Sequence, residues 1–216
     1  MTFRIGRLHV ITDMALQTRW THVEVARQAI AGGADVVQFR EKRPRTTAEL
    51  VHEARAVREV VQEVGQLIIN DRVDVAIAVH AHGVHLGSGD LEIEVARRVL
   101  PHGLIGGTAN GLVEARWRAQ QPLDYLGVGP VFGTRSKTNP APTLGLEGLV
   151  AIVRAVACPV IAIGNITPER VAAVLDTGAH GVAVLSGVVG SDDPAAAVAR
   201  YRAALNAHAS HVGSPR

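Results

Sequence analysis

The sequence is poor in several residue types that whole classes of protein need. Its 216 residues include one cysteine, Cys158, which excludes an internal disulfide framework and a zinc site built from cysteines. Aromatic residues make up 3%, too few to stack on the bases of a nucleic acid. No apolar run approaches the roughly 18 residues that a membrane span requires, and the N-terminus lacks the apolar segment of a signal peptide. We therefore expect a cytoplasmic protein with no membrane and no nucleic-acid partner.

Lysine is also scarce. Twenty of the 22 basic residues are arginine, and the two lysines are Lys42 and Lys137. A lysine supplies a compact point charge that the planar guanidinium of arginine does not. The two lysines are therefore candidates for a specific role, unless they are chance survivors of a composition biased toward arginine.

Short apolar segments alternate with longer amphipathic segments along the chain. The apolar segments are continuous, as is typical of strands buried on both faces. Glycine follows several amphipathic segments, where it can end a helix just before a strand begins. The predicted strands are Leu8–Thr12, Val36–Arg40, Leu67–Asn70, Gly83–Leu86, Leu104–Gly106, Tyr125–Val128, Val160–Ile163 and Gly181–Leu185. The predicted helices are His22–Ala31, Thr47–Val64, Asp71–Val79, Leu91–Leu100, Gly111–Gln120, Leu146–Ala157, Pro168–Asp176 and Pro194–Ala204.

This alternation predicts an α/β protein with one domain, a single (β/α)8 TIM barrel over residues 1–205. The rival fold, a doubly wound sheet that binds dinucleotides, needs a Gly-x-Gly-x-x-Gly turn after its first strand. The chain has Thr12-Asp13-Met14 there. Residues 206–216 are polar and contain Gly and Pro, so we expect a flexible C-terminal tail. A homo-oligomer is compatible with the sequence but is not indicated by it.

Charged residues gather where the predicted strands end, which is where barrels of this kind place their active sites. Arg40, Lys42 and Lys137 are cations suited to phosphate oxygens. Asp71 and Asp90 follow the third and fourth strands. Each aspartate alone is explained as an acid in the first turn of a helix. Together, beside cations, two carboxylates are the usual protein share of a Mg²⁺ site that also binds phosphate. We interpret the set as a site for a metal–diphosphate.

A second anion site is predicted at the ends of strands seven and eight, the common phosphate-binding corner of this fold. Gly164 and Gly187 let backbone N–H groups approach an oxyanion, and Ser186 can donate as well. Thr134 and Ser136 lie between the two sites, and their hydroxyls either hold a phosphate or bond their own loop. Two phosphorylated groups in one barrel mouth suggest an enzyme that joins two substrates.

Two further features allow two interpretations each. The connection over residues 129–145 is long for this fold and carries Lys137, so it either closes over bound ligand as a lid or is an inert surface excursion. His80, His82 and His85 are spaced closely enough to suggest a metal site. We favour a structural role for them, because no His-Glu-x-x-His pattern accompanies them and His85 falls inside a predicted strand.

The motifs at the strand ends, in this order, resemble the thiamine phosphate synthase (pyrophosphorylase) family, which includes the related thiazole tautomerases. The resemblance covers nearly the whole chain, and its Gln-x-Arg-x-Lys and Asn-Asp-Arg elements are fairly specific. It rests on residues 9–13, 37–42, 67–72, 83–87, 125–132 and 181–186. It implies a (β/α)8 barrel that joins a hydroxymethylpyrimidine diphosphate to a thiazole phosphate, giving thiamine phosphate and diphosphate.

The resemblance also implies roles for individual residues. Asp71 and Asp90 would ligate the cofactor Mg²⁺, and Arg40, Lys42 and Lys137 would be catalytic. The pyrimidine diphosphate would be held by Gln38, Arg40, Lys42, Asn70 and Lys137. The thiazole phosphate would be held by Thr134, Arg135, Ser136, Gly164, Asn165, Leu185 and Ser186. Three positions depart from the family pattern: Thr108 stands for a substrate-binding Ser, Ser136 for a Thr, and Asn165 for a Gly whose replacement would crowd the phosphate corner.

Two alternatives remain beside the synthase. A thiazole tautomerase shares the barrel but needs a positioned acid or base, and Pro130 occupies the place where that family has a His. A degenerate barrel would bind the phosphorylated thiazole without turnover and without dependence on Mg²⁺. The full set of diphosphate and metal residues favours the synthase, since a tautomerase does not need it.

Overall fold

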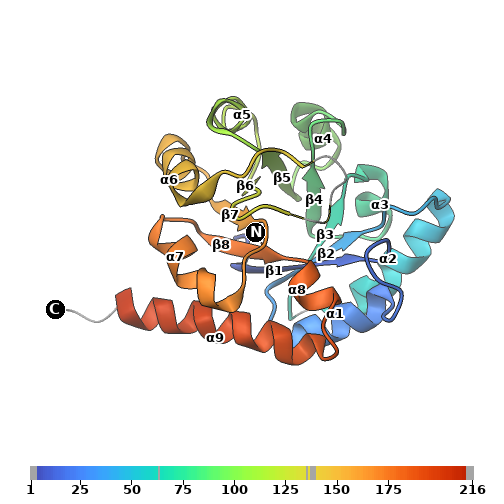
Figure 1. Cartoon of the computed structure of the whole chain (residues 1–216). Coiled ribbons are helices and arrows are strands. Elements are labelled where there is room, and N and C mark those ends of the chain that lie inside the picture. The colour runs from blue at the N-terminus through green and yellow to red at the C-terminus, as the bar shows by residue number, and fades with distance from the viewer. Residues whose placement is uncertain (1–3, 63, 135, 137–139, 213–216) are drawn as a thin grey trace.

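The computed structural model describes residues 4–62, 64–134, 136 and 140–212. Eight parallel strands close into one barrel in sequence order, with helices outside it (Figure 1). The predicted (β/α)8 TIM barrel is therefore confirmed. The strands are β1 (Leu8–Asp13), β2 (Val36–Arg40), β3 (Gln66–Asn70), β4 (Gly83–Leu86), β5 (Leu104–Ala109), β6 (Tyr125–Val128), β7 (Val160–Ile163) and β8 (Gly181–Val184).

The helices follow the predicted pattern with one addition. They are α1 (His22–Ala31), α2 (Thr47–Val61), α3 (Val73–Ala78), α4 (Ile93–Val99), α5 (Leu112–Arg118), α6 (Gly145–Ala155), the 3₁₀ turn η1 (Pro168–Arg170), α7 (Val171–Asp176), α8 (Ser186–Val189) and α9 (Pro194–Val212). The four-residue helix α8, directly after β8, was not expected, because a single turn is too short to show helical periodicity. None of the helices in the described part of the chain combines the length and the hydropathy that a membrane span requires.

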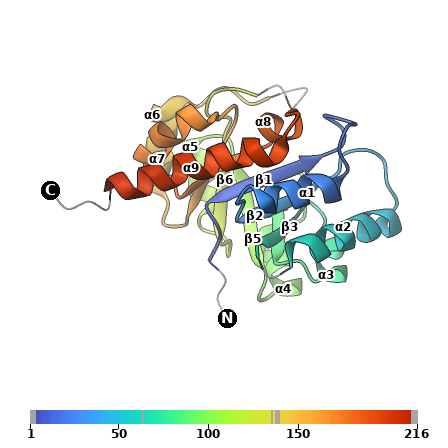
Figure 2. The ribbon, with the colours of Figure 1, turned by 90° about the horizontal axis from the view of Figure 1, so that it is seen from below.

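Helix α9 extends beyond its predicted end. The prediction stopped at Ala204 and placed a tail from Asn206, but residues 206–212 are helical. Leu205 is buried, and Nε2 of His208 lies 3.0 Å from Oδ1 of Asp176 at the end of α7. Figures 1 and 2 show α9 alongside α1 and α7 on the outside of the barrel. These contacts stabilise the last turns against the barrel.

The strands are buried on both faces, which explains their continuous apolar sequences. Residues pointing outward pack beneath the helices, and alternate residues pointing inward form a separate apolar layer inside the barrel. Tyr125 occupies this interior, and a Cβ atom built at Gly106 on β5 would lie 2.2 Å from its ring. A glycine is therefore required beside the tyrosine. The inner apolar layer comprises Ile5, Ile11, Val36, Ile68, Leu104, Tyr125, Ile161 and Ala183.

Alternation along the strands also decides which polar residues reach the mouth of the barrel. Ile11 and Val36 point inward, so Asp13 on β1 and both Gln38 and Arg40 on β2 share the interior face. Thr12 lies on the opposite face and points toward α1. Because β1 and β2 are in register at Asp13 and Arg40, these two charged side chains leave the sheet side by side.

Candidate active site

Arg40 is held at the mouth by a buried carboxylate. Its Nη1 contacts Oδ2 of Asp13, whose side chain is completely buried, while the Arg40 side chain is 17% exposed. The other oxygen of Asp13 accepts the N–H of Ala15 at 2.8 Å. Burial lowers the pKa of Arg40, and the neighbouring Asp71 opposes that shift. The guanidinium is thus oriented by the barrel and still reaches solvent. Gln38, two residues before Arg40 on the same face of β2, is buried.

Lys42, Asp71 and Asp90 converge at the ends of β2, β3 and β4. Nζ of Lys42 lies 2.5 Å from Oδ2 of Asp71, and Asp71 adopts a left-handed backbone conformation with φ of 66°. Oδ2 of Asp90 accepts the N–H of Gly87 at 2.6 Å. Burial raises the pKa of Asp90, and the adjacent Asp71 carboxylate raises it further. The predicted pair of carboxylates is therefore brought together next to a predicted cation.

This arrangement fits a divalent cation. Two neighbouring carboxylates resist ionising together, and a bound cation relieves that repulsion. Carboxylate oxygens are also the ligands that Mg²⁺ prefers in proteins. A cavity of about 300 Å³ lies between the ends of β2 and β3 and helices α2 and α3. Lys42, Asn70 and Asp71 contribute to its lining, whereas Arg40 and Asp90 do not. The site therefore places two carboxylates and a cationic group next to one another.

Thr108 belongs to a hydrogen-bonded group inside the barrel. Its hydroxyl lies 3.0 Å from Nε2 of His85, and Nδ1 of His85 lies 3.2 Å from the hydroxyl of Tyr125. His82 accepts the N–H of Leu67 at its Nδ1, 2.9 Å away, outside this group. These hydrogen bonds support the structural interpretation of His82 and His85, and His85 connects Tyr125 inside the barrel to the predicted substrate residue Thr108.

The predicted thiazole phosphate corner is built around a glycine that nothing larger can replace. Gly164 has φ of 112°, and a Cβ atom there would lie 2.6 Å from Cα of Pro130. The next residue, Asn165, is exposed and takes φ of 48°, which asparagine tolerates. Its Nδ2 donates to the carbonyl of Phe132 at 3.4 Å. The Asn165 side chain is thus hydrogen-bonded to the loop after β6. From the sequence we had instead expected this side chain to crowd the phosphate corner.

The remaining predicted residues that the structure describes lie after β6 and after β8. The Thr134 hydroxyl accepts the N–H of Ser136 at 3.1 Å, which is the alternative in which the loop bonds itself. Leu185 is half-buried and follows β8, and the exposed Ser186 begins α8. Arg135 and Lys137 fall outside the described residues, so their predicted roles stay predictions.

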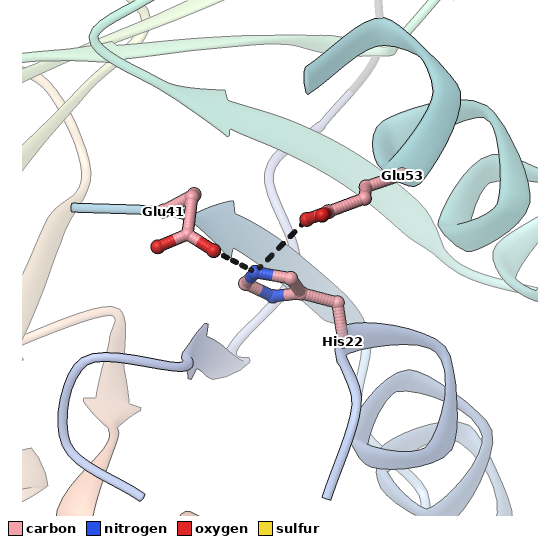
Figure 3. Close-up of side chains that lie close together, drawn as sticks. All are labelled: His22, Glu41 and Glu53. Carbon is pink, nitrogen blue, oxygen red and sulfur yellow. Dashed lines mark hydrogen bonds and ion pairs between the residues drawn. The ribbon is translucent and has the colours of Figure 1, made fainter. Parts of the chain in front are cut away.

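Sequence reasoning missed a partly buried cluster of charged residues behind the end of β2. Nε2 of His22, the first residue of α1, lies 3.3 Å from Oε2 of Glu41 and 3.7 Å from Oε2 of Glu53 on α2 (Figure 3). One potential ligand atom from each of the three residues lies within 4.8 Å of the others. Arg43 is ion-paired with Glu41, and Arg45 lies 3.5 Å from Glu53. The sequence signal for this cluster was that Glu41 stands between two cations, Arg40 and Lys42.

Comparison with known proteins decides the family. A family model described as thiamine monophosphate synthase matches residues 8–188. The chain belongs to this family. The thiamine-phosphate synthase of Salinibacter ruber is 50% identical over 204 residues, which is 94% of this chain and 89% of that protein. The thiamine-phosphate synthase of Chloroflexus aurantiacus is 44% identical, covering 93% of both chains.

A solved structure gives the same result. Thiamine phosphate pyrophosphorylase from Pyrococcus furiosus superimposes with a TM-score of 0.85 at 39% sequence identity, covering 94% of this chain and 96% of that one. The resemblance seen in the motifs is therefore confirmed. As a thiamine-phosphate synthase, the chain is a transferase of thiamine biosynthesis.

Proposed function

We propose that this chain joins 4-amino-2-methyl-5-hydroxymethylpyrimidine diphosphate to 4-methyl-5-(2-phosphoethyl)thiazole, using the cation and carboxylate group at the ends of β2, β3 and β4. The observation that carries the proposal is the convergence of Lys42, Asp71 and Asp90, with Arg40 held nearby by Asp13. Three separate βα loops contribute to this group, since Lys42 follows β2, Asp71 follows β3 and Asp90 follows β4.

The proposed chemistry needs charge stabilisation more than a strong base. The bond between the pyrimidine methylene carbon and the diphosphate oxygen breaks, and the electron-rich aminopyrimidine stabilises the carbon cation that forms. Arg40 and Lys42 neutralise the negative charge that grows on the departing diphosphate, and Lys137 adds a third positive charge. The thiazole nitrogen then forms the new carbon–nitrogen bond, so holding both substrates in place replaces base catalysis.

Asp71 and Asp90 would hold Mg²⁺ in this proposal. When bound, the ion supplies further positive charge to the diphosphate oxygens. Gln38, Asn70 and Thr108 would orient the pyrimidine diphosphate from the interior side. The thiazole phosphate would lie at the opposite corner, against Thr134, Arg135, Ser136, Gly164, Asn165, Leu185 and Ser186. A short helix such as α8 after β8 is a frequent element of phosphate corners in this fold, which supports that placement.

The decisive assay supplies both phosphorylated substrates with Mg²⁺ and measures thiamine phosphate and diphosphate in equal amounts. A parallel reaction offers the carboxylated thiazole phosphate alone and tests for tautomerase activity. We expect Lys137→Ala to lower kcat by about 10²–10³, the effect of removing one donor to a developing oxyanion. Glu92→Gln removes an exposed charge close to Asp90 in sequence and serves as the control. Tautomerisation without any thiamine phosphate would overturn the proposal.

A further inference from the structure

Glu41 lies between the two cations of the proposed diphosphate site, yet its side chain points away from them. The carboxylate is fully buried on the outer face of the barrel. It accepts the backbone N–H of Arg43 at 2.8 Å and the Nε and Nη2 groups of the same arginine at 2.9 and 2.5 Å. Burial alone would raise the pKa of Glu41, but the hydrogen bonds from Arg43 and His22 lower it to about 2. Glu41 is thus a fixed anionic anchor.

His22 connects this anchor to β1 and α1. Its Nδ1 lies 2.6 Å from the hydroxyl of Thr12, and its ring packs on Phe39 with centroids 4.4 Å apart. Burial lowers the pKa of His22 to about 4, so the ring is neutral at pH 7 and carries one N–H. Nδ1 can accept from the Thr12 hydroxyl while Nε2–H donates to Glu41. Both ring nitrogens are then satisfied in a buried position.

The charges of the cluster balance without an added ion. Glu41 and Glu53 contribute two negative charges, and Arg43 and Arg45 contribute two positive charges beside them. His22 adds none at neutral pH. Figure 3 shows the imidazole directed at both carboxylates, joining the loop after β2 to α2. The cluster therefore links β1, α1, β2 and α2, and its balanced charge favours a structural link over a metal site.

We propose that His22 and Glu41 are positioning residues for Arg40 and Lys42. The inference rests on the proposed role of these two cations in binding the diphosphate. Most of the loop that follows β2 is exposed, and the side chain of Lys42 itself is 44% exposed. Because the backbone passes through the buried Glu41 between the two cations, anchoring that one residue restricts both neighbours. Neither His22 nor Glu41 touches the substrate in this proposal.

The test compares isosteric variants in two kinds of measurement. The dissociation constant for inorganic diphosphate with Mg²⁺ is measured by calorimetry, and KM is measured for each substrate. We expect Glu41→Gln to weaken diphosphate binding about tenfold and to raise KM for the pyrimidine diphosphate similarly, because small misplacements of binding groups have effects of this size. KM for the thiazole phosphate should stay within about twofold.

Two substitutions at His22 separate the effect of its hydrogen bond from the effect of its side-chain size. His22→Gln keeps a donor toward Glu41 and should retain most of the diphosphate affinity, whereas His22→Leu should lose about as much as Glu41→Gln. Glu59→Gln removes an exposed charge from α2 and is the matched control. Circular dichroism and thermal melting verify that each variant is folded.

Several results would overturn the proposal. Glu41→Gln and His22→Leu with wild-type diphosphate affinity would remove the positioning role. Equal losses for both substrates would indicate general destabilisation, and stoichiometric zinc that disappears in His22→Leu would make the cluster a metal site. If the wild type itself did not bind diphosphate, that result would refute the proposed function, and the positioning proposal with it.

Discussion

Replacing Asp13 by Asn tests how strongly the barrel holds Arg40. The asparagine keeps the shape of the side chain and the oxygen that accepts the N–H of Ala15, so the change removes mainly the charge. Asp13 is fully buried and Arg40 is 17% exposed. Removing one partner of a buried ion pair destabilises a protein by about 3–5 kcal/mol. Arg40 keeps the nearby Asp71 and some solvent, so we expect a value near the lower limit, about 3 kcal/mol.

The measurement is urea denaturation of wild type and Asp13→Asn, with the activity of each variant measured in parallel. For a chain of this length, a loss of about 3 kcal/mol corresponds to a fall in melting temperature of roughly 6–12 °C. Asp176→Asn is the control, because Asp176 pairs with His208 at the surface and should contribute less than about 1 kcal/mol. We also expect kcat/KM to fall about tenfold, since Arg40 is no longer held in one orientation.

A double-mutant cycle with Arg40→Gln isolates the interaction between the two side chains. If the pair acts as described, the two changes should be strongly non-additive, with a coupling of about 2 kcal/mol. The reasoning would be refuted if Asp13→Asn lost less than about 1 kcal/mol and its effect simply added to that of Arg40→Gln. In that case the contact in the barrel would carry neither stability nor orientation.

Three other predictions follow from the site and the buried histidines. Asp71→Asn and Asp90→Asn should each raise the Mg²⁺ concentration needed for half-maximal rate, and an unchanged titration in both would contradict the metal assignment. Asn165→Gly should leave KM for the thiazole phosphate within about twofold, because the side chain is exposed and donates to the carbonyl of Phe132, so that in the proposed site only the backbone of the Gly164–Asn165 turn faces the phosphate; a large fall in KM would show that the side chain crowds the phosphate. Burial lowers the pKa of His22 to about 4 and of His9 to about 3, so the unfolded chain binds more protons below pH 6.5. The free energy of unfolding should therefore fall as pH drops from about 6.5 toward 4, by up to about 3 kcal/mol per histidine, and His22→Gln should reduce that slope in urea titrations at several pH values.

Most of the fold could be predicted because its signals are local. A strand buried on both faces needs a continuous apolar segment, and Tyr125–Val128 and Val160–Ile163 were bounded as the structure has them. Glycine after a helix marked several junctions. The end of α9 could not be predicted in this way, because its last turns depend on contacts of Leu205 and His208 with other parts of the chain. Polar composition alone suggested a tail.

The candidate site likewise contains residues that could be predicted from the sequence and residues that could not. Lys42, Asp71 and Asp90 could be found because the order of strands in a parallel barrel places successive strand ends side by side. The role of Asp13 could not be predicted, since its ion pair with Arg40 depends on the register between β1 and β2. Glu53 was missed for a different reason. Its approach to His22 depends on the rotational phase of α2 against the barrel, which no spacing in the sequence reveals.

The register of β1 and β2 explains why residues on both faces of β1 connect to the segment that carries Arg40 and Lys42. Thr12 is opposite Phe39 and Asp13 is opposite Arg40, so neighbouring residues of β1 act on opposite sides of the sheet. Asp13 holds Arg40 from inside the barrel, while Thr12 reaches Glu41 through His22 from outside. A slip of one residue would exchange the two faces and break both connections at once. If Arg40 and Lys42 bind the diphosphate as proposed, the contacts that close this part of the barrel also orient these two cations, and substitutions there should change stability and substrate affinity together.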